Sequence, residues 1–168
     1  SGKKYSSLKN KDIIFVTLKG EYDKRKGKPS SEWKFHQDIY LNKKAANAIV
    51  HAHSTNATAI SVHNKVIPAF HYMVALAGGE DIKCAKYATY GTRQLSKNIL
   101  KALKNRKACL ISNHGQIVFD ENLPKAFELA EEVENLSLQY ITALKIGRPK
   151  ILSKKEMNKV LVKSKNYK

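Results

Sequence analysis

The sequence predicts an α/β protein, because segments with the composition of strands alternate with segments that carry helix signals. Residues 48–54 and 108–113 are rich in small, apolar and β-branched side chains, which is typical of buried strands. A long apolar stripe begins after the capping residue Asn122 and stops at Gly147, which predicts a helix. The 168 residues contain no internal repeat and no linker, so we expect a single domain.

Further strands are expected along the chain. Residues 13–18 form an apolar run that ends in a Lys-Gly-Glu turn, which is typical of a strand. Residues 59–62 and 85–90 also have the composition of strands. Residues 116–119 follow a glycine, and we expect them to continue the strand at 108–113.

Helix signals separate these strands. Ser30-Ser31-Glu32 combines serine caps with a carboxylate in the first turn, so a helix should start there. We expect a short helix at 72–77 that ends at two glycines, a helix at 93–104, and a last helix after a capping box at 153–156. The expected apolar helix faces consist of Trp33, Phe35, Ile39 and Tyr40 in the first helix, and Phe127, Ala130, Val133, Tyr140 and Leu144 in the long one.

The chain is strongly basic, with 31 lysines and arginines against 14 acidic residues and a net charge of +17. Such a field attracts nucleic acid or phosphorylated small molecules, although a solvated lysine-rich surface also produces it. Only four of the cations are arginines, and the lysines are dispersed except at 24–28. Surfaces dedicated to nucleic acid favour arginine and exposed aromatic residues, so the composition disfavours a nucleic-acid partner.

The sequence shows no apolar run near the ~20 residues of a membrane span and no signal peptide. Its two cysteines, Cys84 and Cys109, fit neither a disulfide framework nor a zinc ribbon. We therefore expect a cytoplasmic protein with no membrane partner.

Two histidines on one strand indicate a possible metal site. His51 and His53 are two residues apart, so their side chains project from the same face of the strand and present two nitrogen donors. The alternative is a pair of histidines that bond to the backbone. His114 lies where another strand meets a glycine, and three histidines with an open fourth position describe a catalytic zinc site.

The predicted helix start at residues 30–32 has two interpretations. Glu32 is either a catalytic carboxylate or a simple capping residue, and its spacing alone favours capping. Ser30 and Ser31 offer hydroxyl and backbone N–H groups to a phosphate, but they fit plain N-capping as well.

A series of ordered motifs, spread from Ser1-Gly2 to Asn166-Tyr167, carries a resemblance over essentially the whole chain. The motifs are PSSEW at 29–33, HAH at 51–53, IPAFHYM at 67–73, YATYGTR at 87–93, KNRKA at 104–108 and NHG at 113–115. This series resembles the zinc-dependent class II sugar-phosphate aldolases, most closely the branch that acts on L-fuculose 1-phosphate.

The resemblance implies a role for individual residues. His51, His53 and His114 match the three zinc ligands, and Glu32 matches the carboxylate that acts as general acid and base. Tyr72 matches a second catalytic group, a tyrosine that the neighbouring subunit supplies to protonate the aldehyde oxygen. The matches to phosphate-binding positions are Ser30, Ser31, Gly2 and Ser1, and the matches next to the substrate are Tyr90 and Tyr167.

The resemblance also implies the architecture: a central, mostly antiparallel sheet with helices on both faces, and a cyclic homotetramer with active sites at subunit interfaces. Family domains begin with a helix and a Gly-Asn-x-Ser segment ahead of the position that matches Ser1, so we expect this domain, 1–168, to lack its N-terminal helix and first strands. The implied reaction is reversible cleavage of L-fuculose 1-phosphate, or a similar ketose 1-phosphate, to dihydroxyacetone phosphate and L-lactaldehyde, with Zn²⁺ as cofactor.

Alternatives within the same family stay open. Ribulose-phosphate 4-epimerases share the three histidines but typically have an aspartate where this chain has Glu32. Methylthioribulose-1-phosphate dehydratases use a glutamate and three histidines, although the segment 68–73 and Tyr167 favour the aldolase. An adducin-like binding module keeps the fold but tends to lose metal ligands. Cobalt or manganese remains an alternative to zinc.

Overall fold

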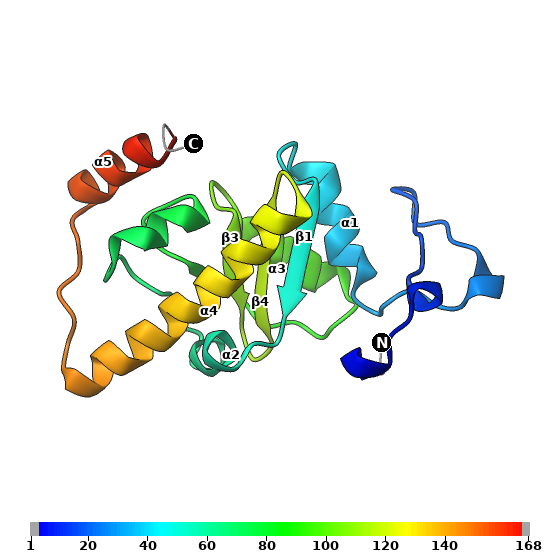
Figure 1. Cartoon of the computed structure of the whole chain (residues 1–168), viewed down its shortest axis with the longest axis horizontal. Coiled ribbons are helices and arrows are strands. Elements are labelled where there is room, and N and C mark those ends of the chain that lie inside the picture. Colours follow the sequence, from blue (N-terminus) through cyan, green and yellow to red (C-terminus); the bar gives the residue numbers. More distant parts are fainter. Residues whose placement is uncertain (1–3, 166–168) are drawn as a thin grey trace.

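The computed structural model describes residues 4–165, and within them a four-stranded mixed sheet carries helices on both faces (Figure 1). The strand order is β1 (Ala48–Ala52), β4 (Gly115–Asp120), β3 (Ala108–Ile111) and β2 (Lys83–Ala85). β4 pairs antiparallel with both β1 and β3, whereas β2 pairs parallel with β3. The expectation of an α/β fold with a mostly antiparallel sheet is confirmed.

Side chains that alternate along the strands divide the core between the two faces of the sheet. Val118 of β4 packs into one apolar cluster, while Ile117 and Phe119 pack into the other. The first cluster lies under the long helix α4, which crosses the sheet in Figure 1, and the second lies under α1 and α3. The helices of the first face are α2 (Thr55–Ser61), the 3-10 helix η4 (Tyr72–Ala77), α4 (Leu123–Ile146) and α5 (Lys154–Lys165), and those of the second are α1 (Trp33–Asn42) and α3 (Arg93–Ala102).

The segment expected to be one strand from 108 to 119 is instead the hairpin of β3 and β4. The two strands pair antiparallel, with Ile111 opposite Gly115, and the chain reverses at 112–114. Asn113 has a φ of 55°, a left-handed conformation that asparagine tolerates better than most residues. Because the chain reverses here, His114 lies at the tip of a turn and not within a strand.

Three other strand predictions are wrong. Residues 59–62 belong mostly to α2, where Ala57 and Ile60 are buried at helical spacing. Only Ala85 of 85–90 lies in a strand, because β2 ends there. Residues 13–18 have no strand partner in the described part of the chain, and Phe15 is 79% exposed. In each case, strand composition alone did not produce a strand, because the structure of a segment also depends on its contacts with the rest of the fold.

The helix signals are more accurate. The Asn122 side chain accepts a hydrogen bond from the Lys125 N–H at 2.9 Å, and α4 runs to Ile146 before Gly147. Of the expected stripe, Ala130 and Val133 are buried, but Phe127 and Leu144 face outward. The buried positions of α4 are Ala126, Leu129, Ala130, Val133, Leu136 and Ser137.

The C-terminal helix α5 is joined to the body of the domain through η4. The Leu152 N–H donates to the Ala69 carbonyl at 2.9 Å, and the Ser153 hydroxyl accepts a hydrogen bond from the Glu156 N–H. Met157 is fully buried in the cluster under α4. None of the helices in residues 4–165 has the length and apolar character needed to cross a membrane.

The N-terminal residues approach the start of α1 without joining the sheet, as the segment at the right of Figure 1 shows. They contain three short 3-10 helices, η1 (Tyr5–Ser7), η2 (Asn10–Asp12) and η3 (Lys24–Lys26). The Gln37 side chain of α1 donates to the Leu18 carbonyl at 2.7 Å, which fixes this segment against α1.

A half-buried histidine in α1, His36, should make the stability of the fold sensitive to acid. Burial, and secondarily the nearby His51, lower the pKa of His36 to about 4 from its ordinary value of 6.5. The unfolded chain therefore binds a proton that the folded chain does not, and stability should fall as the pH drops from 6.5 to 4, by roughly 3 kcal/mol. His36→Gln should remove this component in urea unfolding of metal-free protein. The exposed His63, changed to Gln, is the control; equal slopes for His36→Gln and the unchanged protein would contradict the assignment.

Candidate metal centre

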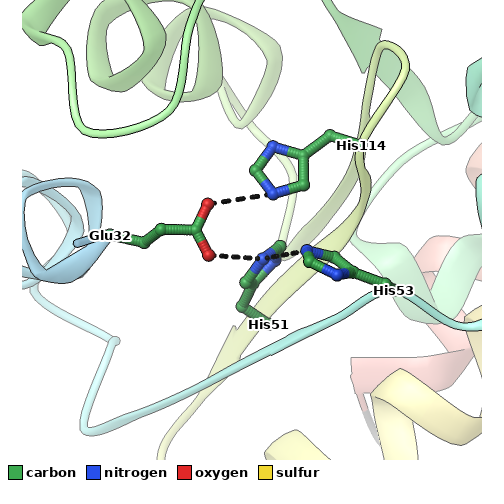
Figure 2. Close-up of side chains that lie close together, drawn as sticks. All are labelled: Glu32, His51, His53 and His114. Atoms are coloured by element: carbon green, nitrogen blue, oxygen red, sulfur yellow. Dashed lines mark hydrogen bonds and ion pairs between the residues drawn. The ribbon is translucent and has the colours of Figure 1, made fainter. Parts of the chain in front are cut away.

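Four side chains from three parts of the chain converge at one end of β1 (Figure 2). His51 lies on β1 and His53 just past its end, His114 lies in the β3–β4 turn, and Glu32 lies immediately before α1. Glu32 Oε1 is 2.9 Å from His114 Nε2, and Glu32 Oε2 is 3.2 Å from His51 Nε2. The Nε2 atoms of His51 and His53 are 3.1 Å apart. One possible ligand atom from each of the four residues lies within 4.8 Å of those of the other three.

Hydrogen bonding shows which nitrogen of His51 faces this group. His51 Nδ1 is 2.8 Å from the Gln116 carbonyl oxygen, and since a carbonyl only accepts, Nδ1 carries the hydrogen. His51 Nε2 therefore faces His53 Nε2 and the Glu32 carboxylate. A metal ion could take the place of a proton between these atoms.

The donor set fits a divalent metal. Two nitrogens that bind one zinc tetrahedrally at ~2.0–2.1 Å lie roughly 3.3 Å apart, close to the 3.1 Å observed between His51 and His53. The ring centroids of the three histidines are 4.8–4.9 Å apart. These histidines would hold the ion, and Glu32 lies where a fourth ligand or a proton-transfer group belongs.

The local electrostatics suit metal binding. Hydrogen bonds from His114 and His51 hold the pKa of Glu32 well below its usual range, which keeps the carboxylate ionised. Burial, with the nearby His51 and His114, lowers the pKa of His53 and so favours its neutral, metal-binding form.

The capping interpretation of Glu32 is not supported. Glu32 occupies the N-cap position of α1, but its side chain makes no capping hydrogen bond. Its carboxylate turns instead towards His51 and His114. The Ser30 hydroxyl accepts a hydrogen bond from the Glu32 N–H at 3.3 Å, so the serine supports the turn that presents the carboxylate.

A cavity of about 950 Å³ opens from this group of side chains. Ser30, Ser31 and Tyr90 line it, as the resemblance implies. Lys26 and Lys28 also line it, and the sequence signal for them was the basic run directly before the serines. The full lining comprises Leu8, Asp12, Ile14, Lys26, Gly27, Lys28, Ser30, Ser31, Glu32, His53, Tyr87, Ala88, Tyr90, Asn113 and His114.

Some expected residues do not join this cavity. Tyr72 lies on η4, is 54% exposed and is not among the lining residues. Ser1, Gly2 and Tyr167 lie outside the described residues. Gln116 was missed, because the contact of its backbone carbonyl with His51 crosses two strands and leaves no sequence pattern.

Comparisons with known proteins agree with this geometry. The profile of the Class II Aldolase and Adducin N-terminal domain matches residues 1–141. An L-fuculose phosphate aldolase of Escherichia coli (strain K12) is 48% identical over 99% of this chain and 78% of its own length. A 5-methylthioribulose-1-phosphate/5-deoxyribulose-1-phosphate aldolase of Rhodospirillum rubrum is 46% identical over 99% of this chain and 75% of its own. A solved L-fuculose 1-phosphate aldolase has a TM-score of 0.91 at 39% identity, over 98% of this chain and 77% of that one.

The sheet, the convergent histidines and the carboxylate together define an α/β domain with a group of side chains able to bind a metal beside an open cavity. The chain belongs to the class II aldolase and adducin family, and the resemblance seen in its motifs is confirmed.

A glycine next to the ligands should be intolerant of a side chain. A Cβ on Gly115 would collide with the Ala52 carbonyl oxygen and lie 3.2 Å from the His53 Cα, and neither backbone atom can rotate away. Gly115→Ala should therefore push β1 and the turn apart, weaken zinc binding at least tenfold in chelator competition, and destabilise the fold by about 1–3 kcal/mol.

The control for Gly115→Ala is Gly79→Ala. A Cβ at Gly79 meets the Arg106 side chain, away from the four converging residues. That variant should lose stability with little change in zinc affinity. If both variants lose affinity equally, the close approach at Gly115 has no special role.

Proposed function

We propose that this chain is a zinc-dependent aldolase that reversibly cleaves L-fuculose 1-phosphate, or a similar ketose 1-phosphate, to dihydroxyacetone phosphate and L-lactaldehyde. The convergence of His51, His53, His114 and Glu32 beside an open cavity carries the proposal. The relative from Escherichia coli that bears the name L-fuculose phosphate aldolase supports the choice of substrate.

The three histidines hold the metal, which supplies Lewis-acid polarisation of the substrate oxygens when bound. Cleavage of the carbon–carbon bond leaves negative charge on the dihydroxyacetone phosphate half. In the direction of synthesis the Glu32 carboxylate removes a proton from the carbon of that half, and in cleavage its protonated form returns a proton to that carbon. The contacts of its carboxylate with His51 and His114, beside the cavity, support this role.

Ser30 and Ser31 bind the phosphate from the start of α1, together with Gly2 and Ser1. Both described serines line the cavity beside Glu32. A phosphate held there supplies binding energy remote from the reacting carbon and fixes the orientation of the sugar. Lys26 and Lys28 line the same cavity and favour the approach of a dianion.

The second proton-transfer group is Tyr72 from a neighbouring copy of the chain in a homotetramer. In synthesis its phenol donates a proton to the aldehyde oxygen, and in cleavage its phenolate form takes the proton of the hydroxyl that becomes the aldehyde. The 54% exposure of Tyr72, on an element that does not line the cavity, suits a residue that serves another subunit. Tyr90, which lines the cavity, and Tyr167 lie next to the substrate in this proposal.

A reducing compartment suits this chain, and we assign the enzyme to the cytoplasm. Cys84 and Cys109 are both free thiols. Burial raises the pKa of both, which keeps them protonated and unreactive.

A second candidate substrate is 5-deoxyribulose 1-phosphate or its methylthio analogue, because a relative named for both is 46% identical. Cleavage of these ketose phosphates releases the same dihydroxyacetone phosphate and differs only in the aldehyde. The proposed metal ligands and phosphate-binding residues serve either substrate, so the aldehyde end decides the preference.

The deciding experiment measures release of dihydroxyacetone phosphate from each of the three ketose phosphates, with and without a chelator. Chelator-sensitive release is expected, with L-fuculose 1-phosphate the best substrate. Zinc binding without release from any of them would favour the dehydratase reaction. Absence of both zinc binding and release would indicate a binding module of the adducin type.

Two substitutions separate metal binding from proton transfer. Glu32→Gln keeps the three histidines and should retain zinc while turnover falls by at least a thousandfold, because the amide cannot exchange the proton. His53→Ala removes a ligand and should lose both zinc and turnover. Zinc content measured after gel filtration, beside initial rates, tests the pair; equal zinc retention in both variants would refute this division of roles.

A further inference from the structure

The segment 51–57 carries two of the proposed metal ligands and the start of α2, and it is held from two sides. On one side lies β4, which pairs with β1 in the register Ala52 opposite Gln116. On the other side lies α4, which contacts both β1 and α2. Polar side chains from both elements bond to the segment at defined atoms.

Gln116 of β4 joins the segment to α4. Its backbone carbonyl accepts from His51 Nδ1 at 2.8 Å, and its side-chain amide donates to the Ser54 hydroxyl at 2.8 Å. The same amide nitrogen donates to the Ala130 carbonyl of α4 at 3.0 Å. Gln116 is only 1% exposed, so these bonds are shielded from water.

Glu134 of α4 caps a helix that lies 78 residues earlier in the chain. Its Oε1 accepts from both the backbone and side-chain nitrogens of Asn56, and its Oε2 accepts from the Ala57 N–H, all at 2.8 Å. Asn56 and Ala57 are the second and third residues of α2, whose N–H groups lack partners within the helix.

A local residue would normally fill this capping role. Ser54 occupies the N-cap position of α2 and is a preferred capping residue, yet it makes no capping hydrogen bond. Its hydroxyl bonds instead to Gln116. A half-buried carboxylate on α4 thus replaces a local cap, and it connects the start of α2 to a different layer of the fold.

Charge strengthens this connection. Burial by itself would raise the pKa of Glu134, but hydrogen bonds from Asn56, Ala57 and Ser54 outweigh burial and lower it. The carboxylate is therefore ionised near neutral pH, and charge-assisted bonds to two N–H groups are shorter and stronger than neutral ones.

From these contacts we propose that Glu134 is a positioning residue for the metal centre, acting through α2 on His53. Ser54 directly follows His53 and Asn56 lies three residues after it, so the position of the α2 start constrains the position of the His53 main chain. The His53 side chain is exposed, whereas His51 and His114 are half-buried, so His53 depends most on the main chain that carries it. The inference rests on the proposed metal site.

The test compares Glu134→Gln with the matched control Glu131→Gln, which removes the same charge from an exposed position on α4. The amide of Glu134→Gln directs N–H groups at the N–H groups of α2. We expect zinc to bind about tenfold more weakly in chelator competition, within the range for residues behind metal ligands. The visible absorption spectrum of the Co²⁺-loaded variant should change, and amide exchange at 55–61 should quicken. The control should match the unchanged protein in all three.

Ser54→Ala is the second variant, because it perturbs the same connection with a smaller change. It should weaken zinc binding in the same direction, by less than Glu134→Gln, and it decides the outcome if Glu134→Gln does not fold. Unchanged zinc affinity and Co²⁺ spectrum, even with lower thermal stability, would overturn the proposal and leave Glu134 a helix cap only. If the unchanged protein itself binds no zinc, the proposed function fails together with this inference.

Discussion

The antiparallel pairing of β1 with β4 is the constraint on which the metal centre depends. It places Ala52 opposite Gln116, so the end of β1 meets the start of β4 and the turn before it. His51 and His53 lie at the end of β1, and His114 lies in the turn before β4. A shift of one residue in this register would turn His51 to the opposite face of the sheet. The ligands therefore converge only if the strands pair in this way.

The sequence predicts the histidines better than their surroundings. Alternation along a strand is a local rule, so His51 and His53 were found from their spacing alone, and His114 from its glycine. Glu32 was identifiable only through resemblance, because its spacing alone favours a helix cap. Gln116 and Glu134 leave no local signal, since they act on residues more than 60 positions away. Long-range contacts of this kind cannot be predicted from local patterns in a single sequence.

The same difference between local signals and long-range contacts explains the errors in the predicted secondary structure. Residues 59–62 have strand composition but follow directly on a helix start that Glu134 caps from another layer. Residues 13–18 are apolar, yet no strand in the described part of the chain pairs with them. The helix bounds at Asn122 and Gly147 were predicted well, because a cap and a glycine act over a single turn. Accuracy therefore falls as the deciding contact becomes more distant.

β1 and β4 are far apart in the sequence, so they can pair only after a long stretch of chain has been synthesised. Ala48 pairs with Asp120, so the ribosome must release more than 70 further residues before β1 finds its partner. Topologies with such distant contacts fold slowly, because loop closure comes before any compensating interaction. The nascent chain carries His51 and His53 long before it carries His114. At the candidate site, a metal ion could therefore meet all three histidines only after the β3–β4 turn has been made, and binding would stabilise the paired strands.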